Sequence, residues 1–122
     1  MGDRGNIVLD YGNKRRIFLY THWSGSELKT TLKKALIRGK SRWEDESYLA
    51  RIIFCEMIKD DITELTGYGI SPTITDNEHP LLIVDLINHK IWFETEEGNK
   101  IKSSYSYEEF VKTKFNEGDD EQ

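Results

Sequence analysis

The chain has 122 residues, of which 37% are hydrophobic and 32% are charged, and its net charge is −5. This length predicts one domain that buries a core without disulfides or metals, and the longest apolar runs, such as LLIV at 81–84, are too short to span a membrane. The single cysteine, Cys55, excludes an intramolecular disulfide and a zinc-finger pattern.

Charge is divided unevenly along the chain. Residues 1–43 hold ten Lys and Arg against three acids, whereas residues 44–122 hold seven against nineteen. The basic segment could bind an anion, a nucleotide or an acidic protein surface. Alternatively, the two halves attract each other within the fold or between subunits. We do not expect DNA or RNA as a partner, because the acidic half would compete with a polyanion.

The first ten residues, MGDRGNIVLD, lack the apolar stretch of a signal peptide. One unpaired cysteine also suits a reducing compartment. Both observations predict a cytoplasmic protein.

Two short strands are expected at 6–10 and 15–20, joined by a turn in which Gly12 and Asn13 tolerate positive φ. These strands would form a first hairpin.

The stretch YTHWSGSEL at 20–28 predicts the start of a helix. Ser24 and Glu27 have the spacing of a capping box, and Trp23 and Leu28 occupy the positions of a hydrophobic staple. The helix is expected to end at Gly39. These roles leave only His22 unexplained in this stretch.

A second helix is predicted from about residue 44 to Leu65, before Gly67. Arg51 and Glu56 interrupt its apolar surroundings. Each must be paired or lie near water, because burying a lone charge is costly.

Residues 66–80 are expected to form a loop, and ordered loops of this length are often functional. Beyond it, strands at 81–87 and 90–96 should form a hairpin around Asn88 and His89.

A further strand is predicted at 99–105, followed by a short helix at 107–115. Ser106 and Glu109 repeat the capping-box spacing, with Tyr105 and Phe110 as a second staple.

The resulting order is ββααβββα. It predicts a single α+β domain over 1–115, with an antiparallel sheet and helices mainly on one face. Residues 116–122 read as an acidic, flexible tail.

Catalytic motifs are absent from the sequence: it has no Gly-x-Ser-x-Gly, no P-loop and no dinucleotide fingerprint. General acid–base chemistry or a metal site would be conceivable if His22 and His79 converged with Asp76 or Glu78. The acids at 56, 60 and 64 could hold a hard cation, but such a stripe is more often a solvated face. We therefore expect neither a cofactor nor a metal.

The best candidate binding surface combines the long loop with neighbouring basic and aromatic residues. From the loop it takes Tyr68, Asp76, Asn77 and His79, together with His22 at the preceding strand end.

From the helices, the same surface takes Arg42 and Arg51, which could bind phosphate or carboxylate, and Trp43, which could stack on a ring. In the alternative interpretation, Arg51 pairs internally with Glu46, Glu56 or carboxylates of the loop, and Trp43 belongs to the core.

Three stretches, YTHWSGSEL, RWEDESYLARIIFCEMI and GYGISPTITDNEHPLLIVDL, together resemble a family of small uncharacterised proteins of bacteria and of their phages or prophages. The resemblance covers residues 17–93 and assigns no catalytic residue. It implies a stand-alone protein of the bacterial cytoplasm, such as a phage accessory factor that blocks a host defence protein or sequesters a nucleotide signal.

Our leading hypothesis is a non-enzymatic binding protein that uses the loop and the adjoining Arg and Trp residues. Its partner would be an anionic, nucleotide-like small molecule or a host protein. One alternative is a small hydrolase or transferase that uses His22 and His79 with Asp76. Another is a structural protein that forms oligomers, by default a homodimer, because two-fold closure is the commonest.

Overall fold

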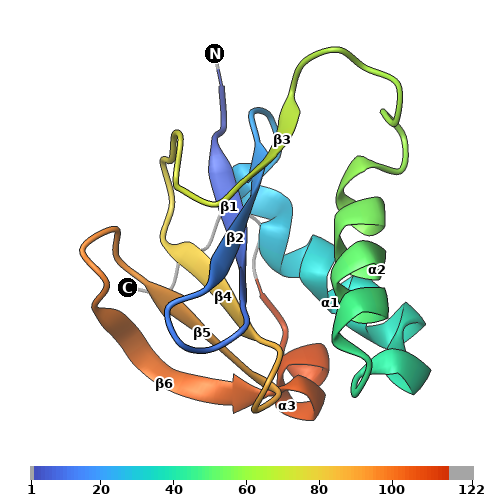
Figure 1. The fold of residues 1–122 in the computed structure, drawn as a ribbon, viewed down its shortest axis with the longest axis vertical. Helices are drawn as coiled ribbons and strands as arrows, with labels where there is room; N and C mark the ends of the chain where they lie inside the picture. The colour runs from blue at the N-terminus through green and yellow to red at the C-terminus, as the bar shows by residue number, and fades with distance from the viewer. Residues whose placement is uncertain (1, 116–122) are drawn as a thin grey trace.

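The computed structural model describes residues 2–115, in which six strands form one sheet and the helices pack on one of its faces (Figure 1). The predicted α+β class is confirmed. The strands are β1 (Gly5–Asp10), β2 (Arg16–Thr21), β3 (Tyr68–Ser71), β4 (Leu81–Asp85), β5 (Lys90–Glu94) and β6 (Lys100–Ser106). The α-helices are α1 (Leu28–Arg38), α2 (Glu46–Ile58) and α3 (Tyr107–Lys112). The predicted tail at 116–122 lies outside the described residues.

The strand order is β3-β2-β1-β4-β5-β6, and every neighbouring pair is antiparallel except β1 and β4. An entirely antiparallel sheet was the simplest expectation. The parallel pair arises because the chain passes through α1, α2 and β3 before it returns beside β1.

The main core lies between the sheet and the helices. Alternation along the strands places Ile7, Leu9, Leu19, Leu82, Val84, Ile91 and Phe93 on this side, where they meet Leu32, Leu36, Leu49, Ile53 and Phe110 of the helices. On the opposite face, Phe18 and Trp92 pack on a smaller cluster of Val8, Leu81 and Ile83. The sheet therefore carries a hydrophobic cluster on each face.

The first hairpin is confirmed, and its turn has the positive φ angles that the sequence predicted. Gly12, Asn13 and Lys14 have φ of 80°, 54° and 63°. This conformation turns three successive basic residues, 14–16, around the end of the hairpin.

The capping box predicted at Ser24 and Glu27 is wrong. Ser24 makes no side-chain cap bond, and its hydroxyl lies 2.9 Å from that of Thr21. Instead, the carbonyl of Asp3 accepts from the Gly25 amide and its carboxylate accepts from the Ser26 amide. A distant residue thus satisfies the first amides, and a 3-10 turn (Gly25–Glu27) precedes α1.

The second helix is shorter than predicted, since it ends at Ile58 rather than Leu65. Two acids, Asp60 and Asp61, come after the C-cap Lys59, where negative charge opposes the helix dipole. Within the expected loop, residues 68–71 pair with β2 and form the edge strand β3. The strand has only four residues and one of them is Gly69, so the local sequence gave no strand signal and only the tertiary pairing could reveal it.

The capping box and staple predicted at the last helix are confirmed. Ser106 and Glu109 exchange both capping bonds, and the rings of Tyr105 and Phe110 lie 5.6 Å apart. None of the helices among residues 2–115 has the length and apolarity needed to cross a bilayer.

Candidate functional site

The segment before β4 is fastened to the N-terminal residues of the chain. The Arg4 guanidinium pairs with the carboxylates of Asp76 at 2.8 Å and Glu78 at 3.0 Å. The side-chain amide of Asn77 lies 3.2 Å from that of the buried Asn6. Two of the predicted loop residues, Asp76 and Asn77, therefore have partners within the fold.

His79 meets a carboxylate that the sequence interpretation did not select. Its Nε2 lies 2.5 Å from Oδ1 of Asp3, whose Oδ2 accepts from the Ser26 hydroxyl at 2.6 Å. Burial acts to raise the pKa of Asp3, but the hydrogen bonds from Ser26 and His79 outweigh it and lower that pKa. Here the carboxylate lies between the serine and the histidine, whereas a serine nucleophile needs the histidine beside its hydroxyl.

His22 and Tyr68 bind residues close to them in sequence. Nδ1 of His22 lies 3.0 Å from the Tyr20 hydroxyl. The Tyr68 hydroxyl donates to Asp61 at 2.9 Å, and burial, followed by this carboxylate, raises the pKa of Tyr68.

Arg42 and Trp43 belong to the turn between α1 and α2, and Arg51 belongs to α2. Figure 1 shows this turn at the end of the helices opposite the arc that leads into β3. The Trp43 indole donates to the Leu36 carbonyl at 2.9 Å and packs against the core, as the alternative interpretation held. The Arg42 guanidinium stacks 4.9 Å from the ring centre of Tyr48. Arg51 is exposed, and it forms no ion pair with any described residue.

Glu56, by contrast, is buried and paired, which is one of the two outcomes expected for it, but Arg51 is not one of its partners. It accepts from Arg38 and Lys59 at 2.9 Å each. Across the described range 2–115, no group of three or more His, Cys, Asp or Glu is placed to hold a metal ion. The predicted site residues thus fall into two separate regions, the loop with His22 and the start of α2.

A different part of the basic segment forms an open cleft of about 580 Å³. We call it the hairpin cleft, and it is lined by Tyr11, Lys14, Arg15, Arg16, Ile17 and Pro72. The first five belong to the β1–β2 hairpin, and Pro72 comes from the predicted 66–80 loop.

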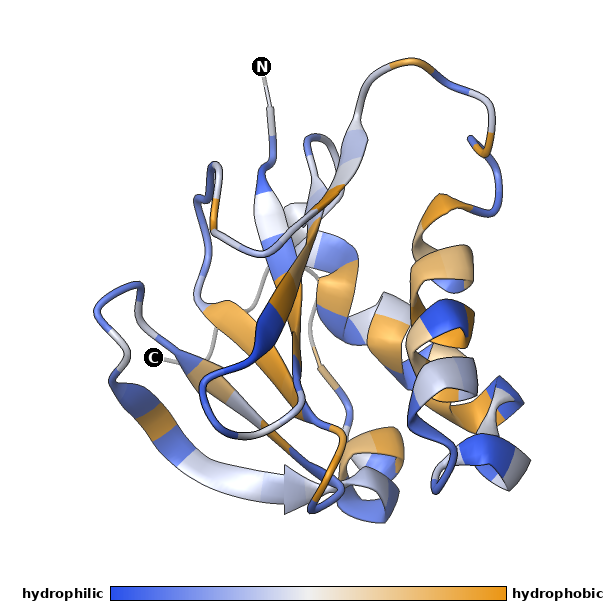
Figure 2. Cartoon of the chain, viewed as in Figure 1, coloured by the Kyte–Doolittle hydropathy of each residue, from blue (hydrophilic) through white to orange (hydrophobic). Residues whose placement is uncertain are grey.

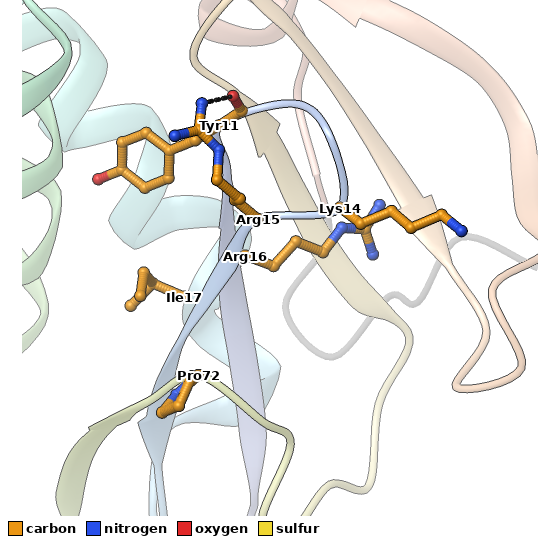
Figure 3. Close-up of a pocket in the computed structure, with 6 residues that line it drawn as sticks. All are labelled: Tyr11, Lys14, Arg15, Arg16, Ile17 and Pro72. Atoms are coloured by element: carbon orange, nitrogen blue, oxygen red, sulfur yellow. Dashed lines mark hydrogen bonds between the residues drawn. The ribbon is translucent and has the colours of Figure 1, made fainter.

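The hairpin cleft has an apolar wall and a cationic rim. Figure 3 shows the side chains of Tyr11, Ile17 and Pro72 on one side of the hairpin, with Arg15 beside Tyr11. The side chains of Lys14 and Arg16 extend the other way. Arg15 is therefore the cation on the side of the apolar wall.

Internal pairs neutralise Arg16 but not Arg15. Arg16 forms ion pairs with Asp10 at 3.1 Å and Glu94 at 3.0 Å. Arg15 donates only to backbone carbonyls, that of Tyr11 at 3.2 Å among them, and has no carboxylate partner among residues 2–115. Its positive charge is available to an anion at the cleft.

The sequence interpretation missed the hairpin cleft, although a signal for it was present. Lys14, Arg15 and Arg16 are the longest basic run in the chain and directly follow an aromatic residue and a turn. Asp3 and Ser26, in contrast, have no local pattern that would have marked them.

No protein-family model matches the sequence, and no curated protein or solved structure matches the chain. The resemblance to small phage and bacterial proteins therefore stays an expectation.

Proposed function

We propose that the protein binds an anionic small molecule that carries a ring, such as a nucleotide, in the hairpin cleft. The observation that carries this proposal is the pairing of an apolar wall with Arg15, a cation that no carboxylate of residues 2–115 neutralises. Small-molecule sites commonly combine an apolar lining with a few polar groups, in volumes of roughly 300–1,000 Å³.

The cleft supplies both kinds of contact that a nucleotide needs. The Tyr11 ring, with Ile17 and Pro72, offers a surface for the base. The Arg15 guanidinium has N–H donors that are not used in its two hydrogen bonds to backbone carbonyls. Its planar arrangement of donors suits the oxygens of a phosphate group. Holding a nucleotide signal away from a host defence system, the role that the resemblance implies, requires only such binding.

Native mass spectrometry of protein purified from an expressing host would test for a retained ligand. Calorimetric titration with ADP, and separately with inorganic phosphate, would then test the chemistry of the site. We expect ADP to bind more tightly than phosphate, because only ADP reaches the apolar wall.

Charge reversal locates the site. Arg15→Glu should weaken ADP binding at least about tenfold, which corresponds to about 1.4 kcal/mol. Arg51→Glu is the matched control, since Arg51 is exposed and lies outside the cleft. If Arg51→Glu abolished binding and Arg15→Glu left it unchanged, the ligand would instead occupy the surface first predicted at the start of α2. If neither ADP nor any retained ligand bound, the proposal would fail and a protein partner would become the leading alternative.

A further inference from the structure

The edge strand β3 has a free side in the described structure. It is the terminal strand of the sheet beside β2, and Figure 1 shows it next to the arc formed by residues 59–67. An unprotected edge of this kind presents backbone donors and acceptors that can pair with another strand.

The direction of these backbone groups follows from the ladder between β2 and β3. The His22 amide donates to the Gly67 carbonyl at 2.8 Å. Because hydrogen-bonded pairs alternate along antiparallel strands, the backbone groups of Gly69 also point toward β2, and those of Tyr68 and Ile70 point outward.

Apolar side chains stand exposed around this edge. Ile70 is 59% exposed and Leu65 is 98% exposed, and Trp23, which lies against Gly67, is exposed as well. Figure 2 shows hydrophobic positions along the arc before β3. A Cβ built on Gly69 would meet nothing within 4 Å, so no side chain obstructs the strand at its centre.

The two ends of β3 carry opposite charge. The arc that leads into the strand holds Asp60, Asp61 and Glu64, whereas Pro72, just after the strand, lies beside the basic turn at 14–16. A second copy related by a two-fold axis would run antiparallel, so the acidic end of each β3 would approach the basic end of the other.

We infer that β3 pairs with β3 of a second copy, giving a two-fold dimer with one continuous sheet. With the axis at Gly69, Tyr68 of each chain lies opposite Ile70 of the other, and the outward backbone groups of both form hydrogen bonds. Ile70 and its exposed neighbours then become partly covered, and the charged ends attract. The basic end of β3 borders the hairpin cleft at Pro72. The strand pairing itself uses the backbone of Tyr68 and Ile70, so the inference does not require a ligand in the cleft.

Sedimentation equilibrium of the full chain over a range of concentrations tests the dimer. We expect a mass of two chains in low salt and a shift toward one chain as salt is raised, because exposed charges are screened. Glu64→Lys should weaken the dimer in low salt, because it replaces one of the three acids of the arc by a base and so reduces the attraction between the two ends. A single-chain mass at every concentration, in wild-type protein, would overturn the inference.

Ile70→Lys should give a monomer, since it places a charge in the interface. The matched control is Ile37→Lys, because Ile37 is 58% exposed and lies on α1. Urea denaturation would show that both variants remain folded. If Ile70→Lys unfolded the chain, Ile70→Pro would replace it, because proline removes only an outward amide there. Dimers that persisted in a folded variant of Ile70 would place the contact elsewhere and contradict the inference.

Discussion

At the scale of single residues, charged side chains join parts of the chain that are far apart in sequence. Asp3 caps the turn before α1 and meets His79, while Arg4 holds Asp76 and Glu78. None of these pairs has a sequence spacing that would predict it. The loop that the sequence marked as functional is therefore held in place by the N-terminal residues.

The pair Arg16–Glu94 connects β2 and β5 across the helix-free face of the sheet. Both carboxylate oxygens of Glu94 accept from the Arg16 guanidinium at 3.0 Å, and the Trp92 indole donates to one of them at 2.7 Å. Burial acts to raise the pKa of Glu94, but these hydrogen bonds outweigh it and lower the pKa.

We expect Glu94→Gln to destabilise the protein by about 2–3 kcal/mol, because it leaves the Arg16 charge without its main partner. Urea denaturation at neutral pH measures the change. Glu97→Gln is the control, since Glu97 is exposed in the following turn, and it should change stability by less than about 0.5 kcal/mol. Equal effects of the two substitutions would contradict a structural role for the pair.

At the scale of elements, two identical motifs had different outcomes. Ser-x-x-Glu predicts a capping box at both 24–27 and 106–109, and only the second forms. At the first, Asp3 reaches the amides from outside the local sequence. Local spacing was sufficient where no distant group competed and failed where one did.

Glu109→Ala should therefore cost about 0.5–1 kcal/mol of stability, whereas Glu27→Ala should cost almost nothing, since Glu27 is exposed and caps no amide. Thermal or urea unfolding of both variants tests this difference. A larger loss at Glu27 would mean that the capping box at α1 does form in solution.

The strand β3 and the early end of α2 were the main errors in the predicted fold. The hairpins, α1, α3 and the α+β class followed from periodicity and turn residues, which act over a few positions. β3 depends on pairing with residues about fifty positions earlier, so no local pattern specified it. The hairpin cleft could not be predicted for the same reason, because it forms only where the fold places Pro72 next to the turn at 14–16.

The approach to β3 depends on Gly67. Its φ is +101°, and a Cβ there would lie 2.1 Å from the ring of Trp23. Gly67→Ala should destabilise the protein by about 1–3 kcal/mol through backbone strain and this clash. Gly69→Ala is the matched control, because its Cβ would meet nothing. Denaturation curves of the two variants measure the difference, and similar stability would show that residues near 67 rearrange without cost.

At the scale of the whole molecule, several cations of the basic half of the sequence form ion pairs with carboxylates of the acidic half. Arg16, Arg38 and Arg4, all from the basic half or near its start, bind carboxylates of the acidic half. These opposite charges therefore attract each other within one chain. Within residues 2–115, Arg15 and the acids before β3 form no ion pair, and these are the charges that the proposed ligand and the inferred second copy would meet.

These internal pairs predict a loss of stability in acid. Five carboxylates have pKa values below their ordinary values because hydrogen bonds and cations favour the ionised form, namely Asp3, Glu56, Glu78, Glu94 and Glu109. Near neutral pH both the folded and the unfolded chain are ionised, and the stabilisation is complete. As the pH falls toward 4.5, the ordinary Glu value, the unfolded chain takes up protons first. The free energy of unfolding must then decrease until the pH passes the lower folded-state pKa values.

Urea denaturation from about pH 7 to about pH 3 measures this dependence as the number of protons taken up on unfolding. We expect more than one proton, because several carboxylates contribute in the same range. Glu94→Gln removes one of these groups and should make the dependence on pH shallower, whereas Glu97→Gln should leave it unchanged. A flat profile in wild-type protein, or an equal slope in the Glu94 variant, would show that the pairs between the two halves do not hold these carboxylates in their ionised form.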